Sequence, residues 1–286
     1  MTSFALTIVL ASAVLHASWN LLAKRASGGV AFVWLITVVS GIAYVPIALA
    51  AALIETPSIG LQELVFICGN AVLHICYFLL LSRGYRTGDL SLVYPLARGT
   101  GPMLATVAAI ILLGERPTPL AITGTTLIGI GVFVFTGGVR VFRDSHARAA
   151  VIFALLTGVI IATYTLWDKY AVDTLEIPVL VYDWTGNLGR CLLLTVFLRG
   201  NWDDVRMEWQ THRMEAIGVG VLSPLAYIMV LSALTFSPVS YIAPVREISI
   251  LIGALMGTLL LSEGDVQRRW VAAGVMVLGV VALAVG

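Results

Sequence analysis

The feature that most constrains this chain is a succession of apolar segments, each about 20 residues long. That is the length a helix needs to cross the roughly 30 Å hydrocarbon core of a bilayer. Of the 286 residues, 59% are hydrophobic and 12% are charged, whereas soluble domains average roughly 45–50% and about 25%. The sequence therefore predicts an all-α membrane protein, for which the lipid bilayer is the main solvent.

Ten transmembrane segments are expected. They run over residues 3–23, 30–53, 61–82, 90–113, 118–137, 149–169, 177–199, 213–234, 239–262 and 269–285. The connection 199–213 is long, and we expect a polar loop there. An alternative is a short interfacial helix, because Trp202, Val205 and Trp209 would share one face of it.

The two halves of the chain repeat each other at an offset of 148 to 150 residues. Several matches occur in the same order: "YFLLLS" (77–82) with "YIMVLS" (227–232), "LSLVYP" (90–95) with "VSYIAP" (239–244), "LLGE" (112–115) with "LLSE" (260–263), and Gly124 and Gly129 with Gly274 and Gly279. Such self-similarity indicates a structural repeat. Because each half holds five segments, the second half enters the membrane from the opposite side. We therefore predict two inverted five-helix repeats, 1–138 and 149–286, in one membrane domain.

Basic residues predict the orientation. Those in the odd-numbered connections are Lys24, Arg25, Arg83, Arg86, Arg140, Arg143, Arg148, Arg199, Arg206, Arg213, Arg268 and Arg269. The even-numbered connections carry only Arg116 and Lys169. Since basic connections stay in the cytoplasm, both termini are expected outside.

Several function classes are disfavoured by composition and motifs. The net charge is +1 and no basic arm occurs, so we expect no nucleic-acid partner. Cys68, Cys76 and Cys191 lack metal-ligand spacing and are expected to be free thiols. No phosphate-binding loop or nucleophile elbow appears, so neither a cofactor nor an enzymatic activity is expected.

Two charged residues interrupt the ninth apolar segment. Arg246 and Glu247 follow Pro244, and Arg98 follows the matching Pro95 in the fourth segment. Each proline is expected to break or kink its helix and leave carbonyl groups free beside the charge. Interrupted segments at corresponding positions of two repeats are a pointer to the substrate site of a transporter. We therefore predict that Arg98 and Arg246 bind an anionic group of a substrate.

A structural explanation of these arginines stays open. Arg98 and Arg246 could extend along their helices towards the membrane surface. Adjacent helical residues point about 100° apart, so one of Arg246 and Glu247 could bind substrate while the other pairs with a neighbouring helix. Arg190 is a third candidate for substrate binding, although it could instead neutralise Asp183, two turns earlier.

Aromatic and ionisable residues complete the candidate site. The tyrosines expected to form an apolar wall with hydroxyl groups are Tyr77, Tyr94, Tyr227 and Tyr241. Trp19, Trp167 and Tyr164 are candidates for the same cavity, with a place at the membrane interface as the alternative. His16 and Asn20 lie four residues apart on one helix face, and their counterparts Tyr164 and Asp168 repeat this spacing; the alternative is that Asp168 and Lys169 are a helix end. Candidates for carrying a coupling proton are Glu247, His16 and His74, since an imidazole titrates near neutral pH; a structural role is the alternative for either histidine.

The five-plus-five pattern, "HASWNLLAKR" (16–25), and the "LLGE" and "LLSE" segments resemble the EamA-type members of the drug/metabolite transporter superfamily. The resemblance covers nearly the whole chain. It implies a multi-pass carrier of the bacterial inner membrane that moves small metabolites, often outwards, by alternating access. Members of the family are usually drawn with both termini in the cytoplasm, whereas the basic residues of this chain indicate the reverse.

The function expected from these features is secondary active transport of a small anionic or zwitterionic metabolite, with proton coupling. A membrane-embedded enzyme would instead need a convergent set of catalytic groups near one interface. A receptor or assembly partner would bind without flux. Gly253 and Gly257 allow close helix packing, either within a monomer or in a homodimer.

Overall fold

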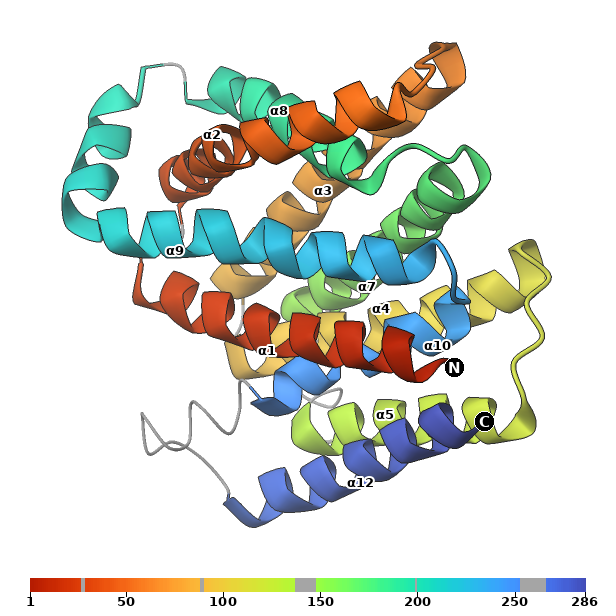
Figure 1. Cartoon of the computed structure of the whole chain (residues 1–286). Coiled ribbons are helices and arrows are strands. Elements are labelled where there is room, and N and C mark those ends of the chain that lie inside the picture. The colour runs from red at the N-terminus through yellow and green to blue at the C-terminus, as the bar shows by residue number, and fades with distance from the viewer. Residues whose placement is uncertain (27–28, 88–89, 137–147, 199, 253–265) are drawn as a thin grey trace.

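The computed structural model describes residues 1–286 except 27–28, 88–89, 137–147, 199 and 253–265, which leaves Gly253 and Gly257 outside the described residues (Figure 1). Within the described part, all regular secondary structure is helical. The helices are α1 (Ser3–Arg25), α2 (Val30–Glu55), α3 (Leu61–Thr87), α4 (Leu90–Leu112), α5 (Pro119–Thr136), α7 (Arg148–Lys169) with a π-helical turn (Tyr170–Thr174), α8 (Val179–Phe197), α9 (Trp202–Leu234), α10 (Val239–Val245) and α12 (Val266–Val285).

Five of the described helices are long and apolar enough to cross a membrane. They span Ser3–Ala23, Val30–Glu55, Leu61–Thr87, Arg148–Thr174 and Trp202–Leu234. Shorter apolar helices cover Leu96–Leu112, Pro119–Phe135 and Trp270–Val285. The expectation of an all-helical membrane architecture is confirmed, and the crossing of the bilayer by all ten segments stays a prediction.

The segment before the eighth predicted span is helical, so the expectation of a polar loop at 199–213 is wrong for most of it. Helix α9 begins at Trp202 and is kinked at His212, whose φ of −127° and ψ of 30° are not helical. Asp203 and Asp204 lie in the first turn, where negative charge is favourable at a helix N-terminus. The ring of Trp202 packs edge-on against Trp34 at 5.4 Å. The helical alternative therefore describes this segment better, and its place at the membrane interface stays a prediction.

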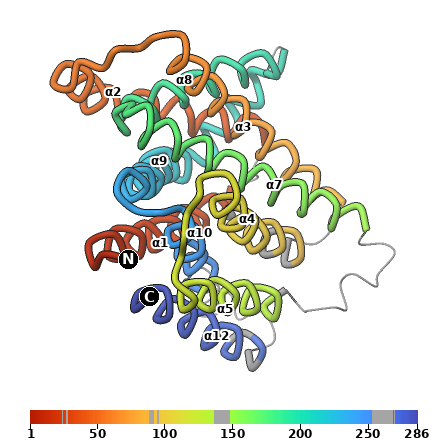
Figure 2. The backbone as a smooth tube through the Cα atoms, turned by 90° about the vertical axis from the view of Figure 1, so that its right-hand side faces the viewer, coloured from red at the N-terminus to blue at the C-terminus, as the bar shows by residue number. Residues whose placement is uncertain are grey.

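Equivalent helices of the two repeats run in opposite directions (Figure 1). Helix α1 runs away from the end of the molecule at which both termini lie, and its counterpart α7 runs towards that end. Helices α4 and α10 are related in the same way. Figure 2 shows α5 and α12 side by side along one edge, with α2 and α8 at the opposite edge. The second repeat is therefore inverted relative to the first.

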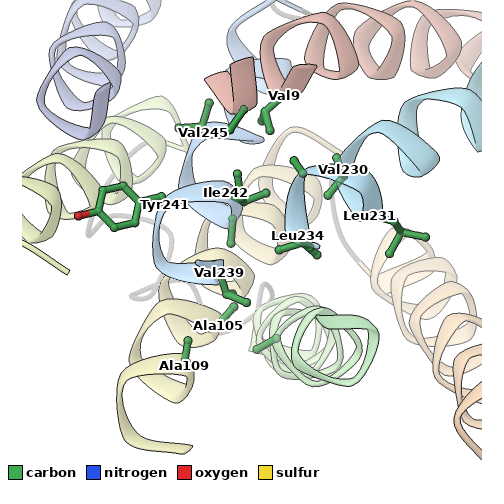
Figure 3. Packing of buried hydrophobic residues seen from close by; sticks show 14 of the residues in the cluster. Val9, Ala105, Ala109, Val230, Leu231, Leu234, Val239, Tyr241, Ile242 and Val245 are labelled. Atoms are coloured by element: carbon green, nitrogen blue, oxygen red, sulfur yellow. The ribbon is translucent and has the colours of Figure 1, made fainter. Parts of the chain in front are cut away.

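The halves interlock instead of forming two separate bundles. Helix α1 packs on α9, and the equivalent pair α7 and α3 pack in the same way. Helix α10 lies in the middle, in contact with α1, α4, α5, α7, α9 and α12. All seven of its residues are buried. Figure 3 shows Ile242 and Val239 of α10 among side chains such as Val9, Ala105 and Leu234 from three other helices.

The carboxylate of Glu115 joins the two halves at the start of α10. It accepts hydrogen bonds from the backbone N–H groups of Val239 (2.7 Å) and Ser240 (2.9 Å). A helix leaves its first N–H groups without intrahelical partners, and an acidic side chain there satisfies them and complements the helix dipole. The "LLGE" segment of the first repeat therefore caps the buried helix of the second.

Glycines allow the backbones of α5 and α12 to touch. A Cβ atom at Gly279 would lie 2.7 Å from the carbonyl oxygen of Gly124, and one at Gly124 would lie 2.5 Å from that of Gly279. We therefore expect Gly279→Ala to lower the free energy of unfolding by about 1–3 kcal/mol, because neither backbone can yield cheaply. Thermal unfolding in detergent measures this change.

Gly274 provides the matched control on the same helix. A Cβ atom at Gly274 would meet nothing within 4 Å. Gly274→Ala is expected to be neutral or to stabilise the protein by up to about 1 kcal/mol, because alanine favours the helix. Equal destabilisation by both substitutions would contradict the close contact of α5 with α12.

Candidate functional site

A cavity of about 270 Å³ lies between helices of the two halves. Helices α1, α2, α3 and α4 line it from the first half, and α7, α8, α9 and the residue after α10 line it from the second. Its polar and ionisable lining residues are Ser12, His16, Thr37, Ser40, His74, Tyr77, Arg98, Tyr164, Asp183, Asn187, Arg190, Ser223, Tyr227 and Arg246. Equivalent helices of both repeats thus contribute to one site, and α5 and α12 do not.

Helix α10 ends at Val245, directly after Pro244, and the chain then forms a tighter turn. The N–H group of Glu247 donates to the carbonyl of Pro244 (3.0 Å), and that of Ile250 donates to Glu247 (2.9 Å). Both bonds span three residues, one fewer than in an α-helix. The break that we expect at Pro244 is therefore present.

The first half differs from the expectation of a matching break. Helix α4 continues without interruption from Leu90 through Pro95 to Leu112. Pro95 stands near the start of this helix, where the loss of one N–H group removes only one hydrogen bond. The side chains of Pro95 and Tyr94 lie outside the described residues.

Arg246 is the buried cation whose charge the described residues leave unbalanced. Its side chain lines the cavity, and the residue is only 9% exposed. Among the described residues it has neither an ion-pair partner within 4.0 Å nor a side-chain hydrogen bond. A buried charge without a partner is costly, so the cavity is electrostatically suited to an anion at this position.

Glu247 pairs with Arg98 and not with its neighbour Arg246. Arg98 Nε lies 3.4 Å from Glu247 Oε2, and Arg98 Nη2 donates to Ser249 Oγ at 3.3 Å. Arg98 lines the cavity, whereas Glu247 lies behind it and is 2% exposed. If Pro95 is aligned with Pro244, Arg98 and Glu247 occupy the same position in the two repeats. The ion pair therefore joins equivalent points of the inverted halves.

Arg190 lines the cavity but has partners in the described structure. Its Nη2 lies 3.7 Å from Asp183 Oδ1 on the same helix, and its Nη1 donates to Asn70 Oδ1 of α3 at 3.2 Å. Asp183 also lines the cavity. Arg190 and Asp183 therefore nearly cancel in charge, which leaves Arg246 as the unpaired cation of the lining.

Aromatic rings form one wall of the cavity. His74 stacks on Tyr164 with ring centres 4.6 Å apart and meets Tyr227 edge-on at 5.3 Å. Tyr77 lies edge-on to Tyr164 at 6.1 Å. All four of these side chains line the cavity, as the sequence predicts for the tyrosines among them.

The first helix contributes a second group of rings to the cavity. His16 packs edge-on against Trp19 at 4.6 Å, and both residues line it. The indole Nε1 of Trp19 has no acceptor among the described residues. An acceptor in the cavity would satisfy this buried donor.

Two predicted aromatic residues lie elsewhere. Trp167 stacks on Phe66 at 4.2 Å, and its indole N–H donates to the Phe66 carbonyl at 2.8 Å. The hydroxyl of Tyr241 accepts from the Thr118 N–H group at 3.3 Å, next to the C-terminus. Neither residue is among those that line the cavity, because the helix faces that carry them turn towards α3 and α5.

Asp168 is the residue whose position the sequence leaves open. Helix α7 ends at Lys169 and passes directly into a π-helical turn, so Asp168 lies in its last turn, yet it is buried. Its carboxylate accepts hydrogen bonds from Asn70, Tyr182 and Tyr227, on three different helices. The spacing of four residues from Tyr164, which repeats that of His16 and Asn20, is the sequence signal for its place on a polar helix face.

The described residues contain no group of three His, Cys, Asp or Glu side chains placed to hold a metal ion. All three cysteines are free. The chemistry available in the cavity is therefore that of guanidinium, imidazole, carboxylate and hydroxyl groups.

Comparison with known proteins gives a family and a fold. The model of the EamA-like transporter family matches the chain twice, over residues 3–137 and 148–285. The chain has no significant match among curated proteins. Among solved proteins, one crystal structure has a similar fold. The similarity covers 100% of this chain and 98% of the other chain, with a TM-score of 0.77 at 16% sequence identity. This likeness shows the fold. The resemblance drawn from the motifs is confirmed, and with its apolar spans this multi-pass membrane protein belongs to the EamA-like transporter family.

Proposed function

We propose that this protein is a secondary transporter of a small metabolite with one anionic group, which Arg246 binds. The observation that carries the proposal is the buried guanidinium of Arg246, which faces the cavity without an ion-pair partner among the described residues. A bound carboxylate or phosphate-like group would supply charge-assisted, two-point hydrogen bonds. Such bonds are stronger away from water.

The size and lining of the cavity support a small substrate. Its volume of about 270 Å³ is at or just below the range of roughly 300–1,000 Å³ for drug-sized ligands. Rings of His74, Tyr77, Tyr164 and Tyr227 would contact the apolar part of the substrate. A zwitterion would also find Asp183 in the lining, within reach of an ammonium group.

Alternating access is the mechanism proposed for the transport. Its support is the position of the cavity between interlocked inverted repeats, together with the broken segment after α10. Rocking of one repeat against the other would open the cavity to each side in turn. On the basis of the family resemblance we propose export across the bacterial inner membrane. From the basic residues we propose that both termini lie outside.

Reconstitution into lipid vesicles tests this function. Purified protein in proteoliposomes would be loaded with a mixture of small carboxylates, amino acids, amines and neutral sugars, and efflux would be followed by mass spectrometry. We expect saturable efflux of one or more anionic or zwitterionic compounds, and its loss in Arg246→Gln. Arg206→Gln, at an exposed position of α9, is the control and should transport normally.

Three outcomes would contradict the proposal. Binding of an anion without flux would indicate a receptor or an assembly partner. Appearance of a chemically altered compound would indicate a membrane-embedded enzyme. Equal efflux by the parent and by Arg246→Gln would remove Arg246 from substrate binding.

A further inference from the structure

Three buried carboxylates in the described part of the chain have different surroundings. Glu247 and Asp183 each lie within 4.0 Å of an arginine, at 3.4 Å from Arg98 and 3.7 Å from Arg190. Asp168 is 1% exposed, and no described arginine, lysine or histidine lies within ion-pair distance of it. Of the three buried carboxylates, Asp168 is therefore the one whose charge no described cation balances. A buried charge without a counter-ion is readily neutralised by a proton.

Three neutral donors surround the Asp168 carboxylate. Oδ1 accepts from Asn70 Nδ2 (2.9 Å) and from the Tyr182 hydroxyl (2.7 Å), and Oδ2 accepts from the Tyr227 hydroxyl. An ionised carboxylate can accept all three bonds, whereas a protonated one must itself donate from the oxygen that holds the proton. Adding a proton at Oδ2 therefore forces the bond to Tyr227 to reverse.

Tyr227 connects this carboxylate to the cavity, because its side chain also lines the cavity. While Tyr227 donates to Asp168, its oxygen can only accept on the cavity side. After the bond reverses, the phenol accepts from Asp168 and its own O–H group is available to donate into the cavity. Protonation of Asp168 thus changes the Tyr227 hydroxyl from a hydrogen-bond acceptor to a donor on its cavity side.

We propose that Asp168 is a proton-binding site of this protein and that Tyr227 couples it to the substrate cavity. A hydronium ion in the cavity gives its proton to the Tyr227 oxygen while the original phenolic proton passes to Asp168 Oδ2. The products are water, a neutral carboxylic acid and a phenol whose O–H group faces the cavity. Two proton transfers take place, the protein takes up one proton in net, and no other reactant is needed.

Other charged and titratable groups face Asp168 from each element packed around it. From α3 it is His74, whose Nδ1–H group donates to the Asn70 carbonyl at 2.9 Å. From α8, Arg190 bonds to Asn70 and opposes proton uptake through its positive charge, and Asp183 beside it offsets that effect.

The remaining facing groups lie on α9 and on the same helix. Tyr227 is the titratable group from α9, and Tyr164 lies one turn before Asp168 on the same helix. Lys169 follows Asp168 directly, but its ammonium group points to the Leu234 carbonyl (2.7 Å) and to Asp173 (3.0 Å). No described neighbour therefore supplies the full compensating cation that the other two buried carboxylates have.

The consequence for transport rests on the proposed function. An anion held by Arg246 gains a donor when Tyr227 turns its O–H group into the cavity, so proton and anion would each favour binding of the other. The carrier would then move both in the same direction. An exporter of this kind uses the outward gradient of the anion and carries one proton out with it.

Infrared difference spectroscopy of the empty, detergent-purified full chain tests the proton site directly. Spectra would be compared between mildly acidic and mildly alkaline solution. We expect the C=O band of a protonated carboxylic acid at the acidic condition, together with a change in tyrosine ring bands. Asp168→Asn should remove the carboxylic acid band, and Asp173→Asn, an exposed carboxylate nearby, should leave it in place.

Tyr227→Phe keeps the proposal testable if Asp168→Asn does not fold. It retains the carboxyl group but removes its Oδ2 partner, so the C=O band should persist at a shifted frequency and the tyrosine change should vanish. A carboxylic acid band that survives Asp168→Asn, or the absence of any such band in the parent, would overturn the proposal. Because no substrate is added, this result is independent of whether the protein transports an anion.

Discussion

Arg246→Lys is expected to weaken binding of the transported anion by about ten- to a hundredfold, although the positive charge is kept. The planar guanidinium can contact two oxygens at once, and lysine cannot reproduce that geometry. A hydrogen bond to a charged group contributes about 1.5–3 kcal/mol, and each 1.4 kcal/mol corresponds to a factor of about ten in affinity. Titration calorimetry in detergent, with a compound identified by efflux, measures the change.

Arg98→Lys is the matched comparison for this prediction. Arg98 lines the same cavity, but its charge is already balanced by Glu247 and one of its nitrogens bonds to Ser249. We therefore expect a smaller loss of affinity than in Arg246→Lys. Unchanged affinity in Arg246→Lys, in protein shown to be folded, would mean that this residue does not bind the anion.

Glu247→Gln is expected to produce the largest loss of stability, because it removes the carboxylate that pairs with the buried Arg98. Both side chains are at most 5% exposed. Removing one partner of a buried pair typically costs about 3–5 kcal/mol of the free energy of unfolding. Thermal unfolding in detergent or in lipid measures the effect.

A double replacement separates the ion pair from other effects of this substitution. Replacing both partners by apolar residues, as in Arg98→Met with Glu247→Leu, is expected to recover most of the lost stability, because no charge then remains unpaired. Glu208→Gln is the control: its pair with His212 is only partly buried and joins neighbouring turns of one helix, so its effect should be below about 1 kcal/mol. If Glu247→Gln unfolds like the parent, the pair with Arg98 is not a structural link between the halves.

The helical membrane architecture could be predicted from the sequence because lipid imposes strict requirements on a chain. A segment that crosses hydrocarbon must be long, apolar and internally hydrogen-bonded, and these properties can be read residue by residue. The repeat could be recognised for a similar reason, since matched motifs keep their order at a constant offset. The helical start of α9 is predicted less well, because polar residues outnumber the apolar residues that form one face of the helix there.

Arg246 and Glu247 show what the sequence alone leaves open about the site. Their presence in an apolar segment indicates a functional position, and Pro244 indicates the break beside them. Which of the two charges faces the cavity depends on the backbone conformation of the turn after α10. It also depends on where α4 places Arg98, which lies 148 residues before Arg246 in the chain. Only the packed structure decides that Glu247 is compensated and Arg246 is not.

Asp168 marks the same limit more sharply. Beside Lys169 it looks like the polar end of a helix, and its spacing of four residues from Tyr164 does not say which partners it meets. Its partners come from α3, α8 and α9, and Tyr227 lies 59 residues away in the chain. The sequence by itself determined the class of protein, its repeat and the polar residues that lipid would not tolerate without a purpose. The tertiary structure decided which of those residues meet, because the energy of a buried charge depends on neighbours that only the fold brings within a few ångströms.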